Sequence, residues 1–159
     1  MKLLVPVDGS NASINAVKKA LELARKYSFS IKLISVVAKK NSENRKHENA
    51  WKGIDSSVIS ESEELEKQLE NKIKENAQRL LNAIVSKLNF SGIRVETEVL
   101  LGEPYAKIIE AARNDNIDII VMSNRGFSKV KRFFVGSVTQ KVISDAPCPV
   151  LVVNAGFEP

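Results

Sequence analysis

Residues 2–10 read KLLVPVDGS, a short apolar run that ends in turn-forming residues. The run is too brief for a helix, and the lack of polar alternation is typical of a strand covered on both faces. A helix follows, with Ser10, Asn11 or Ser13 available as its cap. Its apolar residues share one face: Ala16, Val17, Ala20, Leu21 and Ala24. Residues 31–37 (IKLISVV) then predict a second strand, so the chain begins β-α-β.

The remainder of the chain continues this alternation. A third strand is predicted at residues 93–100, where apolar and charged residues alternate. This alternation indicates one solvent-exposed face and hence a strand at the edge of the sheet. A fourth strand at 118–122 is almost wholly apolar and therefore central, and a fifth closes the chain at 149–153. Helices are predicted after Gly102, with Pro104 in the first turn, and over about 137–144.

The middle of the chain differs from both flanks. Residues 39 to about 60 are charged and rich in Ser and Asn, which indicates a flexible insertion. Ser60 and Glu63 have capping-box spacing for a long helix that follows. We interpret the apolar stripe of this helix as facing the core, in preference to binding a partner. The stripe consists of Leu65, Leu69, Ile73, Ala77, Leu80, Leu81, Ile84, Val85 and Leu88.

Strands that alternate with helices predict an α/β fold with a parallel, doubly wound sheet and right-handed crossovers. In such sheets, ligands bind outside the carboxyl ends of the strands, where the strand order reverses. The first and fourth strands are the most apolar, so we expect them to be central neighbours. This arrangement places a crevice between Asp8 and the loop after Met122.

Length and composition limit the class of protein. The 159 residues contain 43% hydrophobic and 27% charged residues, as in an ordinary globular domain. The single cysteine excludes a disulfide scaffold, and no apolar run is long enough for a membrane span or a signal peptide. We therefore expect a cytoplasmic protein with no membrane partner. The net charge of +5 favours anionic partners without choosing among them.

The loop after the fourth strand has features of an anion site. Gly126 and Gly136 bracket it, and glycine lets backbone amides approach an anion closely. Gly136 and Ser137 also open a helix, whose free N–H groups favour phosphate. Arg125 and three further Lys or Arg residues lie in the same segment. A simple turn with solvated charges explains these residues equally well, so both interpretations stay open.

Several segments together resemble the universal stress protein family. They are VPVDGS at residues 5–10, GEP at 102–104, DIIVM at 118–122 and APCPVLVV at 146–153. Nucleotide-binding members of that family carry Gly, two residues, Gly, nine residues, Gly and then Ser or Thr. Here the spacing runs from Ser123 through Gly126 to Gly136 and Ser137. The resemblance covers nearly the whole chain apart from the charged insertion.

The resemblance implies a single domain over residues 1–159 with a Rossmann-like fold of the adenine nucleotide alpha hydrolase-like type. Its five-stranded parallel sheet would have the order 3-2-1-4-5, with helices on both faces. It also implies a regulatory protein of the stress response that binds an adenine nucleotide, most often ATP with Mg²⁺ or Mn²⁺. The residues assigned by position to this site are Pro6, Val7, Asp8, Val36, Met122, Ser123, Arg125, Gly126, Gly136, Ser137 and Val138.

The resemblance implies roles for most of these residues. Asp8 matches the acidic residue on the ribose or adenine side, and Val36 matches the position whose backbone faces adenine. Met122 lines the floor, and the segment from Gly136 to Val138 cradles phosphate with Gly126. Ser123 departs from the family pattern, because a Cβ there costs about 1 kcal/mol or more if the position needs a positive φ. Its hydroxyl is expected to compensate in part by donating to a phosphate oxygen.

The resemblance also implies a homodimer through antiparallel pairing of Val150–Val153, an apolar edge otherwise left exposed, and an unidentified protein partner. Nucleic acid is disfavoured, because basic residues do not interleave with an aromatic platform. The first alternative function is a nucleotide-free interaction module, the same dimer with its crevice blocked. Separately, Asp8 at the end of the first strand is open to a simpler interpretation as a cap of the next helix. The second is a slow ATP hydrolase or nucleotidyl transferase, for which the sequence offers no general base or carboxylate cluster. Enzymatic activity therefore stays an open question.

Overall fold

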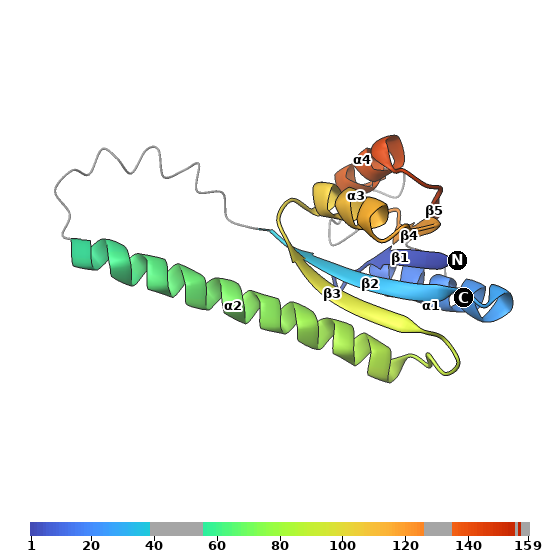
Figure 1. Ribbon diagram of the computed structural model, residues 1–159, viewed down its shortest axis with the longest axis horizontal. Coiled ribbons are helices and arrows are strands. Elements are labelled where there is room, and N and C mark those ends of the chain that lie inside the picture. The colour runs from blue at the N-terminus through green and yellow to red at the C-terminus, as the bar shows by residue number, and fades with distance from the viewer. Residues whose placement is uncertain (39–55, 126–134, 155, 157–159) are drawn as a thin grey trace.

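A parallel five-stranded sheet with the order β3-β2-β1-β4-β5 forms the centre of the molecule (Figure 1). The computed structural model describes residues 1–38, 56–125, 135–154 and 156. The two central neighbours are β1 (Lys2–Pro6) and β4 (Ile119–Ser123), whose register pairs Leu3 with Ile119. The predicted α/β fold and its strand order are confirmed.

The predicted strand bounds, the starts of α1 and α3 and both ends of α4 agree closely with the structure, whereas α2 starts earlier than expected. The strands are β2 (Ser30–Val37), β3 (Val95–Leu101) and β5 (Val150–Val153). The helices are α1 (Asn11–Tyr27), α2 (Ser56–Lys87), α3 (Pro104–Asn114) and α4 (Ser137–Asp145). The alternating strand β3 lies at an edge of the sheet, as predicted.

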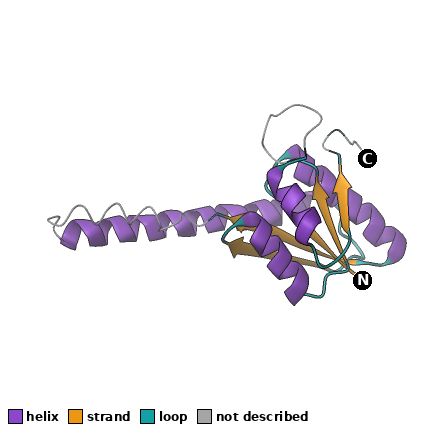
Figure 2. Ribbon diagram, turned by 90° about the horizontal axis from the view of Figure 1, so that it is seen from above, coloured by secondary structure: helices purple, strands orange, loops and turns teal. Residues whose placement is uncertain are grey.

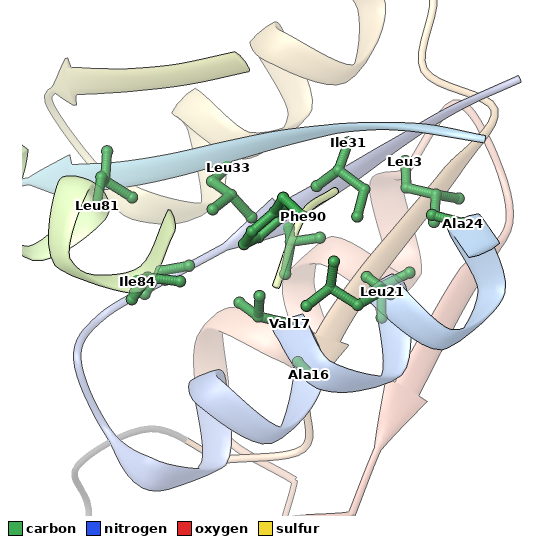
Figure 3. Close-up of a cluster of buried hydrophobic side chains, with 14 of the residues drawn as sticks. Leu3, Ala16, Val17, Leu21, Ala24, Ile31, Leu33, Leu81, Ile84 and Phe90 are labelled. Carbon is green, nitrogen blue, oxygen red and sulfur yellow. The ribbon is translucent and has the colours of Figure 1, made fainter. Parts of the chain in front are cut away.

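Helices cover both faces of the sheet, because successive residues of each strand point to opposite sides. Leu3 and Val5 belong to the buried cluster between the sheet and the layer of α1 and α2. Figure 3 shows Leu3 in this cluster with Val17, Leu81 and Phe90. Leu4, between them in sequence, belongs to the second core cluster, beneath α3 and α4. The two cores hold the carboxyl ends of the strands in fixed positions relative to the helices that follow them.

Two helix starts show how the local sequence sets the chain path. Gly9 has a φ of 89°, a conformation that residues with a Cβ rarely adopt, and it turns the chain from β1 into α1. Of the three candidate caps, Ser10 is the one used, and its side chain accepts a hydrogen bond from the Ser13 N–H. At α3, the Glu103 carboxylate accepts from the Ala106 N–H.

The long helix departs from the prediction at its beginning. It starts at Ser56, so Ser60 lies inside the helix and the capping-box interpretation is wrong. The last residues of the expected insertion at 39–60 are therefore helical, while 39–55 lie outside the described residues.

The apolar stripe of α2 is only partly buried. Leu81 and Ile84 pack into the core, whereas Leu65, Leu69 and Ile73 are 68%, 49% and 42% exposed. The prediction of a core-facing stripe is therefore wrong for the first part of the helix. The reason is length: 32 helical residues span about 48 Å, and the eight residues of β2 span about 26 Å. Figures 1 and 2 show α2 running well past the end of the sheet.

Candidate functional site

A cavity of about 330 Å³ opens where the strand order reverses, between the carboxyl ends of β1 and β4. The start of α3 and the start of α4 complete its wall. The lining residues are Pro6, Val7, Asp8, Val36, Pro104, Ile108, Met122, Ser123, Arg125, Gly136, Ser137, Val138 and Thr139. Every residue assigned from the sequence lines this cavity except Gly126, which lies outside the described residues. Their role in binding stays a prediction.

Asp8 follows β1 directly and is exposed at the rim of the cavity. Its Oδ1 accepts one hydrogen bond from the Ser10 N–H at 2.9 Å and another from the Ser10 hydroxyl at 2.6 Å. These two bonds orient the carboxylate, while Ser10 itself caps α1. The N-cap of α1 is Ser10, and Asp8 supports it from two residues earlier, so Asp8 has a structural role at this helix start. A role of Asp8 in binding stays a prediction.

Ser123 ends β4 and is buried, with 8% of its surface exposed. Among the described residues, the non-glycine positions with positive φ are Ser28 and Asn116, so the Cβ of Ser123 causes no backbone strain. The Ser123 hydroxyl donates to the Arg125 carbonyl at 2.5 Å, and its carbonyl accepts from Thr139 Oγ1 at 3.0 Å. The hydroxyl proton is thus donated within the protein, and the expected contact with a phosphate stays a prediction.

Gly136 precedes α4 and ties that helix to the end of β4. Its N–H donates to the Asn124 carbonyl at 2.8 Å, and its φ of −62° is open to any residue. A Cβ built at Gly136 would meet its nearest protein atoms, from Asn124, Arg125 and Thr139, at 3.6–3.9 Å, which is ordinary contact. Neither backbone conformation nor the protein's own packing therefore requires glycine at this position.

The N-terminus of α4 differs from those of α1 and α3, because no side chain caps it. The residues of its first turn, Ser137, Val138 and Thr139, all line the cavity. The first N–H groups of a helix have no partner within the helix, and the helix dipole places partial positive charge there. This end of the cavity therefore suits an anion, and Arg125 beside it adds a full positive charge.

The opposite part of the lining is apolar. Val7, Ile108 and Met122 are buried, and Val36 and Val138 are half-buried. A few polar groups in a mainly apolar cavity are typical of small-molecule sites. The sequence interpretation missed Pro104, Ile108 and Thr139, although the first belongs to the quoted GEP segment. Ile108 follows one turn later, and Thr139 lies in the first turn of the helix opened by Gly136 and Ser137.

The described residues offer neither a cluster of metal ligands nor a membrane-spanning helix. No group of three or more His, Cys, Asp or Glu side chains is placed to hold a metal ion in that part of the chain. Across the same residues, no helix is long and apolar enough to cross a membrane.

Comparison with known proteins identifies the family. The sequence model described as the universal stress protein family matches residues 1–154. The chain belongs to the universal stress protein family. A universal stress protein of Methanocaldococcus jannaschii is 32% identical over 153 residues, which cover 96% of this family member and 81% of that relative.

Solved structures of other universal stress proteins have the same fold. A second Methanocaldococcus jannaschii member has a TM-score of 0.78 at 27% identity, covering 99% of this chain and 97% of that one. A universal stress protein from Archaeoglobus fulgidus, solved in complex with dAMP, has a TM-score of 0.61 at 22% identity and covers 96% of both chains. At that identity, the second likeness concerns the fold alone.

Proposed function

We propose that this universal stress protein is a cytoplasmic regulatory protein of the stress response that binds an adenine nucleotide, ATP foremost. The observation that carries the proposal is the placement of Asp8 and the uncapped start of α4 on one cavity. A carboxylate accepts hydrogen bonds from ribose hydroxyls, and helical N–H groups donate to phosphates. The site thus offers separate groups for the two polar parts of a nucleotide.

The remaining lining supports the same ligand. Adenine is a flat, largely apolar ring, and Val7, Val36 and Met122 supply apolar contact beside Asp8. A protein with this fold was solved with dAMP, so the fold is compatible with an adenine nucleotide. In this proposal, Gly136, Ser137 and Val138 cradle the phosphates with Arg125.

The donor set also indicates how a cation would be held. Among the described lining residues, Asp8 is the only carboxylate, and its Oδ1 already accepts two hydrogen bonds. An Mg²⁺ or Mn²⁺ ion bound with ATP would therefore be held mainly by the phosphate oxygens. The cation would neutralise phosphate charge, and the chain's own residues would position the nucleotide.

We also propose that residues 1–159 form one domain and that two copies pair antiparallel through β5. This strand lies at the sheet edge, and Leu151 is 37% exposed there. Unpaired edge strands are covered by partners in many proteins. Binding of a nucleotide between β4 and α4 would change the surface beside β5, which a protein partner can recognise.

The second candidate is a nucleotide-free interaction module of the same dimer. The contact from the Ser123 hydroxyl to the Arg125 carbonyl favours it, because the contact fixes the chain beside the cavity without a ligand. A slow hydrolase ranks lower, since the described lining contains no histidine and no carboxylate besides Asp8 to act as a general base.

The test is to denature the purified protein and identify any released nucleotide by chromatography with mass detection. Near-stoichiometric ATP or AMP would support the proposal. No released nucleotide, together with no thermal shift on addition of ATP and Mg²⁺, would contradict it and favour the interaction module. Sustained phosphate release from added ATP would instead support the hydrolase.

A further inference from the structure

The first half of α2 presents an apolar face that the sheet does not cover. Leu65, Leu69 and Ile73 repeat at every fourth residue, so they lie on one side of the helix. All three are among the large apolar side chains most exposed in the described part of the chain. We call these three residues the α2 stripe.

The α2 stripe lies outside the packing that holds α2 on the domain. The second half of the helix supplies the core contacts, through Leu81 and Ile84, and Gln78 Nε2 donates to Thr97 Oγ1 on β3 at 3.4 Å. Figure 2 shows the other half projecting away from the body of the protein. A projecting helix with charges on all sides would be ordinary, but this one keeps an apolar row in solvent.

The charges of α2 are divided between its two halves. Residues 56–71 carry five glutamates and one lysine, whereas residues 72–87 carry four Lys or Arg residues and one glutamate. Two such helices side by side in parallel would place like charges together. In antiparallel orientation, the acidic half of each helix lies beside the basic half of the other, for example Glu66 near Lys72.

We propose that two copies of this protein pair antiparallel along α2, with their α2 stripes in contact. A twofold interface requires a surface that is complementary to itself, and the divided charge of α2 meets that requirement. A foreign partner would not need this division of charge. The interface is separate from β5, so pairing through both surfaces would build a tetramer from two dimers when the two twofold axes meet at right angles.

The first experiment measures molecular mass by sedimentation and light scattering over a concentration series. The Leu65→Glu and Leu69→Glu double variant places like charges in the paired face, so its mass should fall to half that of the wild type. The control is Asn71→Glu, which adds one negative charge on the opposite side of α2 and should leave the mass unchanged. Circular dichroism checks that both variants stay folded. We expect them to, because the side chains of Leu65, Leu69 and Asn71 are exposed to solvent.

A variant at β5 separates the two interfaces. Leu151→Glu disrupts the proposed β5 pairing, and in that background the α2 pair should persist as a dimer. Equal mass for wild type and the Leu65→Glu and Leu69→Glu variant would overturn the α2 proposal, whatever the state of β5. A monomer for Leu151→Glu alone would overturn it as well.

Charge reversal and distance measurements test the orientation. Glu64→Lys with Glu66→Lys makes α2 mainly basic, and Lys72→Glu with Lys74→Glu makes it mainly acidic, so each should weaken self-association about tenfold or more. Mixing the two variants should restore pairing. Spin labels on cysteines placed at Asn71 or Arg79, with Cys148→Ser, should give a shorter distance between copies for position 71. Equal distances at both positions would indicate parallel helices and overturn the proposal.

Discussion

Gly136 allows a loss of binding to be separated from a loss of folding. Its φ of −62° suits alanine, and a Cβ there meets protein atoms only at 3.6–3.9 Å. The extra methyl group is therefore harmless to the fold but occupies space at the start of α4, where a phosphate would approach. We expect Gly136→Ala to weaken ATP binding about tenfold, which is about 1.4 kcal/mol, with an unchanged melting temperature of the free protein.

The measurement is isothermal titration calorimetry, with a thermal melt of each variant. Gly156→Ala is the matched control, because Gly156 also lacks a positive φ and is not part of the cavity lining. If Gly136→Ala bound ATP as tightly as the wild type, the phosphates could not lie against this helix start.

A substitution at Ser123 tests whether its hydroxyl donates to the protein or to a bound nucleotide. Because it donates to the Arg125 carbonyl, we expect Ser123→Ala to lower the free energy of unfolding by about 1 kcal/mol. Affinity for ATP should stay the same, since the hydroxyl is not available to a phosphate. Urea denaturation and calorimetry on one preparation measure both quantities. A large loss of affinity with unchanged stability would mean that the hydroxyl contacts the nucleotide after all.

The same residue marks how far the sequence could predict the site. Motif spacing placed Asp8, Gly136 and Ser137 around one cavity, because each lies next to the end of a strand or the start of a helix. The hydrogen bond from the Ser123 hydroxyl depends on where the chain places the Arg125 carbonyl and on the φ angle of Ser123. Neither can be read from residue type, so the hydrogen bond to the Arg125 carbonyl was not predictable from the sequence.

At the scale of elements, α2 shows that the periodicity of apolar residues does not predict which of them are buried. A period of three and four residues identifies the face of a helix that is apolar, but not whether a sheet is long enough to cover it. The buried Leu81 and the exposed Leu65 belong to the same sequence stripe. The bounds of the shorter helices were predictable because Pro104 and the Gly136-Ser137 pair mark their starts locally.

This division of α2 predicts unequal effects of the same substitution. Leu81 is completely buried, so Leu81→Ala removes core contacts and should lower the free energy of unfolding by about 2–5 kcal/mol. Leu65→Ala should change it by less than about 0.5 kcal/mol, because the side chain is 68% exposed. Urea denaturation is measured at a protein concentration low enough to keep copies apart. A comparable loss for both variants would mean that Leu65 is packed against the same chain.

At the scale of the whole molecule, one ion network joins the sheet to the helical layer over it. Lys32 on β2 is buried, and its Nζ lies 2.6 Å from Glu98 of β3 and 2.6 Å from Asp115 at the end of α3. Burial alone would lower the pKa of Lys32, but the hydrogen bonds to Asp115 and Glu98 outweigh it. The pKa of Lys32 is therefore raised above its ordinary value.

A lysine whose pKa is raised by folding stabilises the protein fully below the pKa of the unfolded chain, about 10.4. That contribution is lost as the pH rises through the higher pKa of the folded state. We therefore expect the free energy of unfolding to fall steeply above about pH 10. The Lys32→Met variant has no titratable group at position 32, so its free energy of unfolding should fall less steeply over the same pH range. Urea denaturation between pH 7 and 11 compares the two slopes, and parallel curves would show that Lys32 does not link the sheet to α3 through its charge.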